Sequence, residues 1–219
     1  SDKNDPFKEL GADQPIPEHY KDRRYDQSIY GSFPSEGFEL IEKYVEKITG
    51  QGYITPPDST EQKNTVDFAL KRYRIAESHI VYQVLSKEIS EEVLKNLNNG
   101  QGMISLGEYS YWSTDKDTIY RTIDRKSENF KLENHIDFPE KIGIPQYVPD
   151  AIIVEYELGS GSEGICIEGY EDTKSYLTKN HDNYIVTDMN MVDDHDNYNQ
   201  HGKHVLKLTV RRGFSGDVL

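Results

Sequence analysis

The chain has 219 residues, enough for one large domain or for one domain with an N-terminal extension. Its formal net charge is -14, from 39 acidic and 25 basic residues, which disfavours nucleic acids and anionic lipids as partners. A protein partner with a basic surface fits this charge better. The alternative is that the charge serves only to keep the protein soluble. No apolar run approaches the roughly 20 residues of a membrane span, so none is expected.

The N-terminal part is expected to be an arm followed by helices. Residues 1–36 are polar and punctuated by proline, which indicates an extended arm. Apolar residues at helical spacing over 38–48, with Gly50 after them, predict one amphipathic helix. A similar spacing predicts a second helix over 64–75.

The rest of the chain is expected to alternate strands and short helices. Runs rich in β-branched and aromatic residues predict strands at 79–85, Ala151–Leu158 and 205–210, with shorter ones at 164–168 and 184–187. Ser90 is the predicted N-cap of a helix that ends at Asn99 and Gly100. The single cysteine, Cys166, excludes an internal disulfide and is expected to be buried in an apolar strand. Together these elements predict the α+β class.

In their order along the chain, these segments resemble the catalytic domain of bacterial mono-ADP-ribosyltransferase toxins of the iota and insecticidal binary-toxin type. The resemblance is carried by the strand at 79–85, by Tyr111-Trp112-Ser113-Thr114 and by Ala151–Leu158. It implies N-terminal helices followed by a split, mostly antiparallel β-sheet core, with an arm at 1–36 and the transferase-like domain at 37–219. It also implies a secreted, extracellular bacterial protein.

The same resemblance implies where NAD would bind. In that family, an Arg on the first core strand holds a phosphate of NAD with the two-pronged geometry that guanidinium offers. Gln83 stands at that position, and Ser113-Thr114-Asp115 resembles the Ser-Thr-Ser strand of the family. Trp112, beside Ser113, would lie on the floor of the NAD cleft or serve as an ordinary core residue. The cofactor-binding candidates are therefore Gln83, Trp112, Ser113 and Thr114.

The family's catalytic carboxylate belongs to a Glu-x-Glu pair late in the chain, and it stabilises the oxocarbenium-like transition state. The matching segment here is 169–177, where Lys174 or Ser175 falls on the catalytic position, depending on a one-residue gap. Glu171 and Asp172 are the nearby acids and hence the catalytic candidates. The literal pair Glu155 and Glu157 comes one segment too early and is expected on a solvated face.

A histidine-rich acidic stretch at 193–204 is the densest cluster of potential metal ligands. His195, His201 and His204, with the acids between them, could bind zinc, whereas a hydrated surface loop is the alternative.

Three functions remain open from the sequence. The first is a non-catalytic toxin-related domain that binds a protein partner and needs no cofactor. The second is an active mono-ADP-ribosyltransferase that uses NAD with atypical catalytic residues. The third is an unrelated acidic α+β domain for interaction or metal binding. For the second, the acid would come from Glu168, Glu171 or Asp172 and the anchoring cation from Arg72, Arg74 or Arg121.

Overall fold

The structure is a computed structural model that describes residues 35–75, 77–126, 132–137, 147–167, 173–192 and 204–213. The chain divides into two compact units. Unit 1 comprises Ser1–Ile80, Glu108–Thr114 and Glu157–Lys179; unit 2 comprises Val81–Gly107, Asp115–Tyr156 and Asn180–Leu219. The arm predicted at 1–36 lies almost entirely outside the described residues, and the domain boundary predicted at residue 37 stays a prediction.

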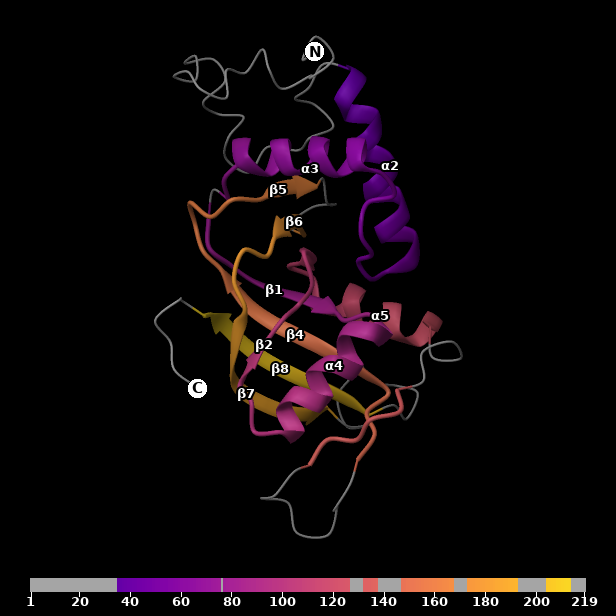
Figure 1. The fold of residues 1–219 in the computed structure, drawn as a ribbon, viewed down its shortest axis with the longest axis vertical. Helices are drawn as coiled ribbons and strands as arrows, with labels where there is room; N and C mark the ends of the chain where they lie inside the picture. The colour runs from indigo at the N-terminus through magenta and orange to yellow at the C-terminus, as the bar shows by residue number, and fades with distance from the viewer. Residues whose placement is uncertain are drawn as a thin grey trace. The chain divides into compact units, whose positions relative to one another are not determined.

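Helices precede and punctuate a single eight-stranded sheet (Figure 1). The helices are α2 (Ser35–Gln51), α3 (Thr60–Arg72), α4 (Lys87–Asn98) and α5 (Lys116–Lys126). The strands are β1 (His79–Val84), β2 (Met103–Ile104), β3 (Tyr109–Ser113), β4 (Ala151–Leu158), β5 (Ile165–Ile167), β6 (Ser175–Lys179), β7 (Tyr184–Val192) and β8 (Val205–Arg212). Their order is β2-β7-β8-β4-β1-β3-β6-β5. The sheet is mostly antiparallel, with β4 and β8 parallel, which confirms the predicted α+β class.

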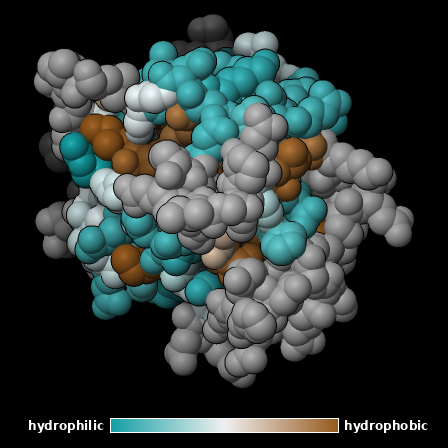
Figure 2. Space-filling model, turned by 90° about the horizontal axis from the view of Figure 1, so that it is seen from below, coloured by the Kyte–Doolittle hydropathy of each residue, from teal (hydrophilic) through white to brown (hydrophobic). Residues whose placement is uncertain are grey.

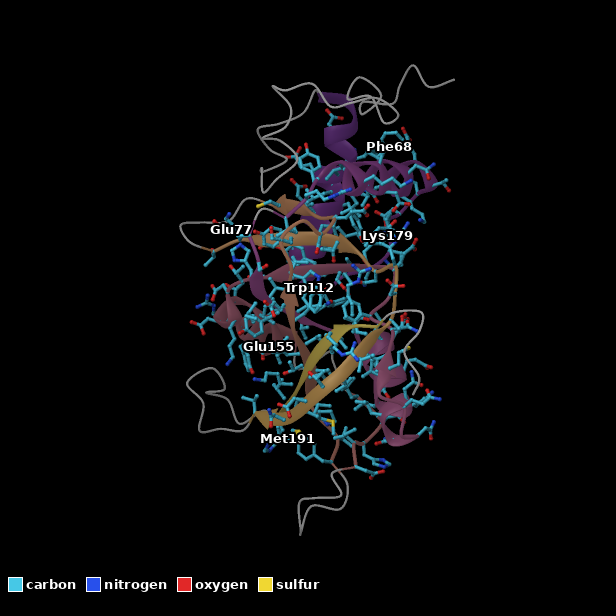
Figure 3. The ribbon with its side chains drawn as sticks, turned by 90° about the vertical axis from the view of Figure 1, so that its left-hand side faces the viewer. Phe68, Glu77, Trp112, Glu155, Lys179 and Met191 are labelled. Carbon is cyan, nitrogen blue, oxygen red and sulfur yellow. The ribbon has the colours of Figure 1, made fainter. Side chains whose placement is uncertain are left out.

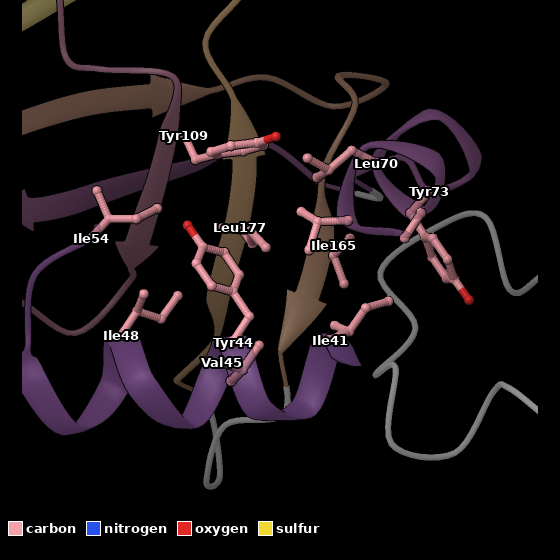
Figure 4. Packing of buried hydrophobic residues seen from close by; sticks show 12 residues of the cluster. Ile41, Tyr44, Val45, Ile48, Ile54, Leu70, Tyr73, Tyr109, Ile165 and Leu177 are labelled. Carbon is pink, nitrogen blue, oxygen red and sulfur yellow. The ribbon is translucent and has the colours of Figure 1, made fainter. Parts of the chain in front are cut away.

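The core of unit 1 forms where α2 and α3 pack on β3, β5 and β6 (Figure 4). Tyr44 of α2 is fully buried, its ring meets Tyr109 of β3 edge to face at 6.3 Å, and its hydroxyl donates to the Thr55 carbonyl at 2.7 Å. Its polar end is therefore satisfied inside an apolar cluster, as a buried tyrosine requires. The other members of that cluster are Ile41, Val45, Ile48, Ile54, Val66, Ala69, Leu70, Tyr73, Ile165 and Leu177.

An ion-pair network also ties α3 to the β3–β6 pair. The Asp67 carboxylate accepts hydrogen bonds from the Tyr109 hydroxyl at 2.5 Å and from Lys63 at 2.9 Å, and it pairs with Lys179 at 3.1 Å. Burial alone would raise the pKa of Asp67, but the hydrogen bonds from Tyr109, Lys63 and Lys179 together hold it below its usual value. Glu108 pairs with Lys63 at 2.7 Å, so each charge in the network has an opposite neighbour. The network therefore favours the ionised form of Asp67.

Unit 2 is built on β2, β7, β8 and β4. Residues Ala151–Val154 of β4 are all buried, which explains why this run is continuously apolar in the sequence. Directly after β1, the Leu85 N–H donates to the Ile152 carbonyl of β4 at 3.0 Å. The predicted strand Ala151–Leu158 matches β4 residue for residue.

The N-cap predicted for α4 is wrong by one helical turn. Ser86, not Ser90, has the extended backbone of a cap, and its hydroxyl accepts from the Ile89 N–H at 3.4 Å. Ser90 lies inside the helix, fully buried, and its hydroxyl is within 3.4 Å of the Leu85 carbonyl. A serine that bonds a carbonyl of the preceding turn can be accommodated inside a helix, so serine alone did not identify the start.

Two polar side chains of α4 hold the short segment 132–137. Glu91 accepts the Glu133 N–H at 2.6 Å and the Asn134 N–H at 3.0 Å. Asn98 donates to the His135 carbonyl at 2.6 Å and accepts the Asp137 N–H at 3.1 Å. These bonds replace a strand partner for backbone that lies outside the sheet.

Of the helices in the described residues, none is long and apolar enough to cross a membrane. The described residues visible in Figure 2 are mostly hydrophilic, with apolar residues confined to a few small patches. This distribution agrees with a mean hydropathy of -0.79.

Replacing the central acid of the network tests its contribution. Asp67→Asn should lower the free energy of unfolding at pH 7 by about 1–3 kcal/mol, because the amide cannot satisfy two ammonium groups. Since the pKa of Asp67 is lowered in the folded state, its stabilisation is present above the unfolded pKa of about 3.9 and lost as the pH falls through the folded value. The difference between wild type and variant, measured by urea unfolding, should therefore shrink below about pH 4. Glu46→Gln on exposed α2 surface is the matched control, and an equal loss there would contradict the network's role.

Candidate functional site

The Ser-Thr element lies at the end of β3, directly against the start of β6. In the antiparallel register, Ser113 is opposite Ser175. The Thr114 N–H donates to the Lys174 carbonyl at 2.9 Å, and the Lys174 N–H donates to the Thr114 hydroxyl at 2.8 Å. The structure thus brings Ser113 and Thr114 together with Lys174 and Ser175, one of which is predicted to fall on the family's catalytic position. Neither of these two side chains carries a carboxylate.

Trp112 is an interior residue of unit 1. Its side chain is fully buried, and its indole N–H donates to the Thr178 hydroxyl at 2.9 Å (Figure 3). Its partner across the ladder, Tyr176, is also fully buried and stacks on His79 at 5.8 Å. The packing of Tyr176 and Thr178 beside Trp112 was not predicted from the sequence. Tyr176 and Leu177 stand in the segment 169–177 matched to the family, but three buried residues in a row show no alternation that would reveal which of them pack beside Trp112.

Gln83 lies near the end of β1, in unit 2, with only 2 % of its surface exposed. Its amide is neutral and has no forked pair of charged donors, in contrast to guanidinium. Buried amides in proteins are almost always hydrogen-bonded, so we expect the Gln83 amide to bond other groups of the protein. Whether Gln83, Trp112, Ser113 or Thr114 contacts a cofactor stays a prediction.

Asp115, the third residue of the Ser-Thr-Asp element, begins a helix. Its carboxylate accepts the Asp117 N–H at 3.0 Å and the Thr118 hydroxyl at 2.5 Å. That is the bonding of an N-cap at the start of α5. Asp115 is therefore the N-cap of α5.

The acids proposed for catalysis are placed only in part. Glu171 and Asp172, like Glu168, lie outside the described residues. The earlier pair is on β4, where Glu155 forms an ion pair with Lys207 at 3.2 Å and Glu157 is exposed. The expectation of a wholly solvated face fits Glu157 only, because Glu155 is half-buried.

The arginines considered as substitutes make local interactions where they are described. Arg74 donates to the Lys71 carbonyl at 3.1 Å and forms a weak ion pair with Glu163 at 3.7 Å. Arg121 is largely exposed and lies 3.9 Å from the Asp115 carboxylate. The side chain of Arg72 lies outside the described part of the structure.

Of the metal candidates, only His204 is described. It is exposed, and its ring meets the Tyr147 ring edge to face at 5.3 Å. Its backbone N–H donates to the Asp150 carboxylate at 2.7 Å. His195 and His201 lie outside the described residues. Among the residues whose placement is described, no group of three His, Cys, Asp or Glu side chains could hold a metal ion. The predicted metal loop therefore stays a prediction.

Comparison with known proteins rests on structure alone, since no family model and no curated protein matches this sequence. Plx2a, an ADP-ribosyltransferase toxin from Paenibacillus larvae, is similar over 90% of this chain and 94% of its own, with 14% identity and a TM-score of 0.51. C3larvin toxin, an ADP-ribosyltransferase from the same organism, is similar over 84% of this chain and 98% of its own, with 13% identity and a TM-score of 0.48. C2-I, the enzymatic component of the C2 toxin from Clostridium botulinum, is similar over 84% of this chain and 45% of its own, with 10% identity and a TM-score of 0.49.

The chain therefore has the fold of the bacterial mono-ADP-ribosyltransferase toxins, as the order of its segments predicted. Identity this low carries the fold and does not carry residue roles. The functional question thus returns to the side chains at Gln83 and along the β3–β6 ladder.

The structural role of Gln83 can be measured directly. Gln83→Met keeps the volume of the side chain and removes its amide, which should cost about 1–3 kcal/mol of unfolding free energy, because a group that bonds a buried amide would lose its partner. Urea unfolding measures this loss, and Gln101→Met, at an exposed side chain of the same unit, should change stability by less than about 0.5 kcal/mol. Equal stability of the two variants would contradict a bonded role for the Gln83 amide.

Proposed function

We propose that this chain is a secreted bacterial toxin-related domain of the ADP-ribosyltransferase fold that does not turn over NAD and instead binds a protein partner. The observation that carries the proposal is the pairing of Ser113 with Ser175 and of Thr114 with Lys174. The resemblance predicts that Lys174 or Ser175 falls where the family has its carboxylate, and neither side chain carries one.

The chemistry of glycosidic cleavage explains why these residues matter. As the bond to nicotinamide breaks, positive charge develops on the ribose, and a carboxylate lowers the barrier by stabilising that charge. The Ser175 hydroxyl has no charge to offer, and the Lys174 ammonium would repel the developing cation. Gln83 adds a second deficit, because a neutral amide cannot offset the charge of a bound phosphate.

The charge of the chain supports a protein partner with a basic surface. A net charge of -14 produces a field that repels phosphate backbones and attracts cationic surfaces. Binding driven in this way should weaken as salt rises, since screening shortens the range of the attraction to about 8 Å at physiological ionic strength.

An active NAD-dependent transferase is the second candidate, favoured by two observations. The structural match covers 94% of the length of Plx2a, an ADP-ribosyltransferase toxin. The acids Glu171 and Asp172 also precede Lys174 by only a few residues in the sequence, so this segment offers a carboxylate near the predicted catalytic position. NAD would then be the cofactor, and Arg72, Arg74 or Arg121 would supply the cation that anchors its phosphate.

Calorimetric titration with NAD, together with an NAD-glycohydrolase assay on the same sample, separates the two candidates. We expect no binding heat at millimolar NAD and no release of nicotinamide above the buffer rate. A transferase toxin of demonstrated activity serves as positive control. The variant Glu171→Gln with Asp172→Asn should behave as the wild type does, because neither acid is in use.

Turnover by the wild type would sink the non-catalytic proposal. If that turnover fell by about 100-fold or more in the double variant, Glu171 or Asp172 would be the catalytic acid and the second candidate would hold. Binding without turnover would leave a domain that retains NAD as a ligand, which also contradicts the proposal as stated.

A further inference from the structure

The outer edge of β7 is only partly covered. β8 pairs with β7 along its whole length, from Tyr184 to Val192. On the opposite edge, β2 pairs only with Tyr184 and Ile185, and the Val186 N–H donates to the Gly102 carbonyl at 2.8 Å. Among the residues that the structure describes, no strand follows β2 along the rest of this edge.

The end of helix α4 explains why β2 stops there. The Gln101 N–H donates back to the Asn96 carbonyl at 2.9 Å, and Gly100 adopts φ +77, so both residues belong to the helix C-cap. The chain reaches β7 only at Gly102 and runs beside it from there to Ile104. Backbone ahead of Gly102 is thus committed to α4 and cannot extend the short strand.

Strand geometry indicates which backbone groups face the open side. In an antiparallel ladder, alternate residues turn their N–H and C=O away from the partner strand. Val186 does so, since it bonds Gly102, and the bulge between Val186 and Asp188 shifts the alternation by one residue. Met189 and Met191 then direct their backbone groups outward, whereas Asp188 and Asn190 bond β8.

The two faces beside this open edge differ in character. Met189 and Met191 lie opposite the fully buried Leu208 and Leu206 of β8, so their half-buried side chains share the apolar face. Asp188 and Asn190 are exposed on the other face, with the Asn190 amide donating to the Asp188 carboxylate at 2.7 Å. Figure 3 marks Met191 at this end of the unit 2 strands.

The sequence of the open edge leaves it receptive. Natural sheets protect exposed edges with lysine, proline or very short strands. Residues 187–192 contain no lysine and no proline, and methionine is a flexible side chain common at surfaces that accept varied partners. A strand added here would gain main-chain hydrogen bonds, with side-chain contacts alternating between the two faces.

We infer that the outer edge of β7 at Thr187–Met191 binds an extended, basic peptide segment of the protein partner by strand addition. The inference rests on the proposed partner-binding function and names its surface. Apolar residues of the peptide would contact Met189 and Met191, and alternate basic residues would lie beside Asp188. A second copy of this chain is disfavoured as the occupant, because two chains of charge -14 repel each other.

Hydrogen exchange of individual amides, followed by NMR on the full chain, tests whether the edge is open. The amides of Met189 and Met191 should exchange at least about tenfold faster than those of Asp188 and Asn190, which are bonded to β8. Protection of Met189 and Met191 in the free protein at all concentrations would mean that another segment of this chain occupies the edge. Protection that appears only at high protein concentration would mean a second copy. Either result overturns the inference.

Addition of a short peptide in which lysine and valine alternate tests the occupant. It should slow exchange at Met189 and Met191, whereas a peptide of the same composition with all lysines before all valines should not. The block peptide has the same charge and so controls for unspecific attraction to an acidic chain. Equal effects of the two peptides, or no effect of either at millimolar concentration, would overturn strand addition.

Variants of β7 provide the matched controls. Met191→Pro removes an outward N–H without removing a bond to β8, and it should weaken binding of the alternating peptide about tenfold or more. Met191→Leu should bind nearly as the wild type does. Should the proline variant not fold, Asp188→Lys tests the same edge, because the new positive charge repels the lysines of the peptide. We expect its affinity for the alternating peptide to fall by a similar factor. NAD binding and turnover do not depend on this edge. If the peptide does not bind, the proposal that the chain does not turn over NAD still stands. If the chain turns over NAD, the peptide result still stands.

Discussion

The register of the β3–β6 ladder is the constraint on which unit 1 depends. It pairs Trp112 with Tyr176, both fully buried, and it allows the indole N–H to reach Thr178. A slip of one residue would turn every side chain of the strand to the opposite face, so Trp112 would leave the core. The same register places Tyr109 opposite Lys179, inside the ion-pair network with Asp67. One ladder therefore positions the Ser-Thr element at one end and anchors helix α3 at the other.

The sequence predicted the parts of the fold whose burial is complete. β4 is buried almost throughout, and its apolar run gave the correct bounds. β7 was predicted to end at Thr187, although it continues to Val192, because Asp188 and Asn190 are exposed and interrupt any apolar run. The cap of α4 was misplaced because Ser86 and Ser90 are both plausible caps, and only the buried position of Ser90 excludes it. The end of β7 and the cap of α4 depend on tertiary packing, which local sequence propensity does not report.

The candidate site shows the same division. The resemblance located the Ser113–Thr114 element and the segment that pairs with it, since both depend on the order of elements. It left a one-residue ambiguity between Lys174 and Ser175, and strand pairing does not remove it, because both residues lie against the element: Ser175 is opposite Ser113, and Lys174 bonds Thr114. The burial of Gln83 was equally inaccessible, because a polar residue in a strand of valine and isoleucine does not reveal which face is covered.

Electrostatics indicates why neutral side chains at Gln83 and Ser175 cost the fold little. A guanidinium buried as deeply as Gln83 would lose its hydration, and without a bound phosphate nothing described at that strand would return that free energy. A carboxylate in place of Ser175 would likewise hold charge at a strand end whose neighbouring Ser113 is nearly buried. Neutral side chains remove both costs, each within its own unit. Transferase chemistry requires accepting those costs, because charge that is strained in the free protein is what binds and cleaves NAD. Under the proposed function, a chain that avoids these costs keeps the fold as a scaffold, and its acidic surface and exposed backbone would bind the partner.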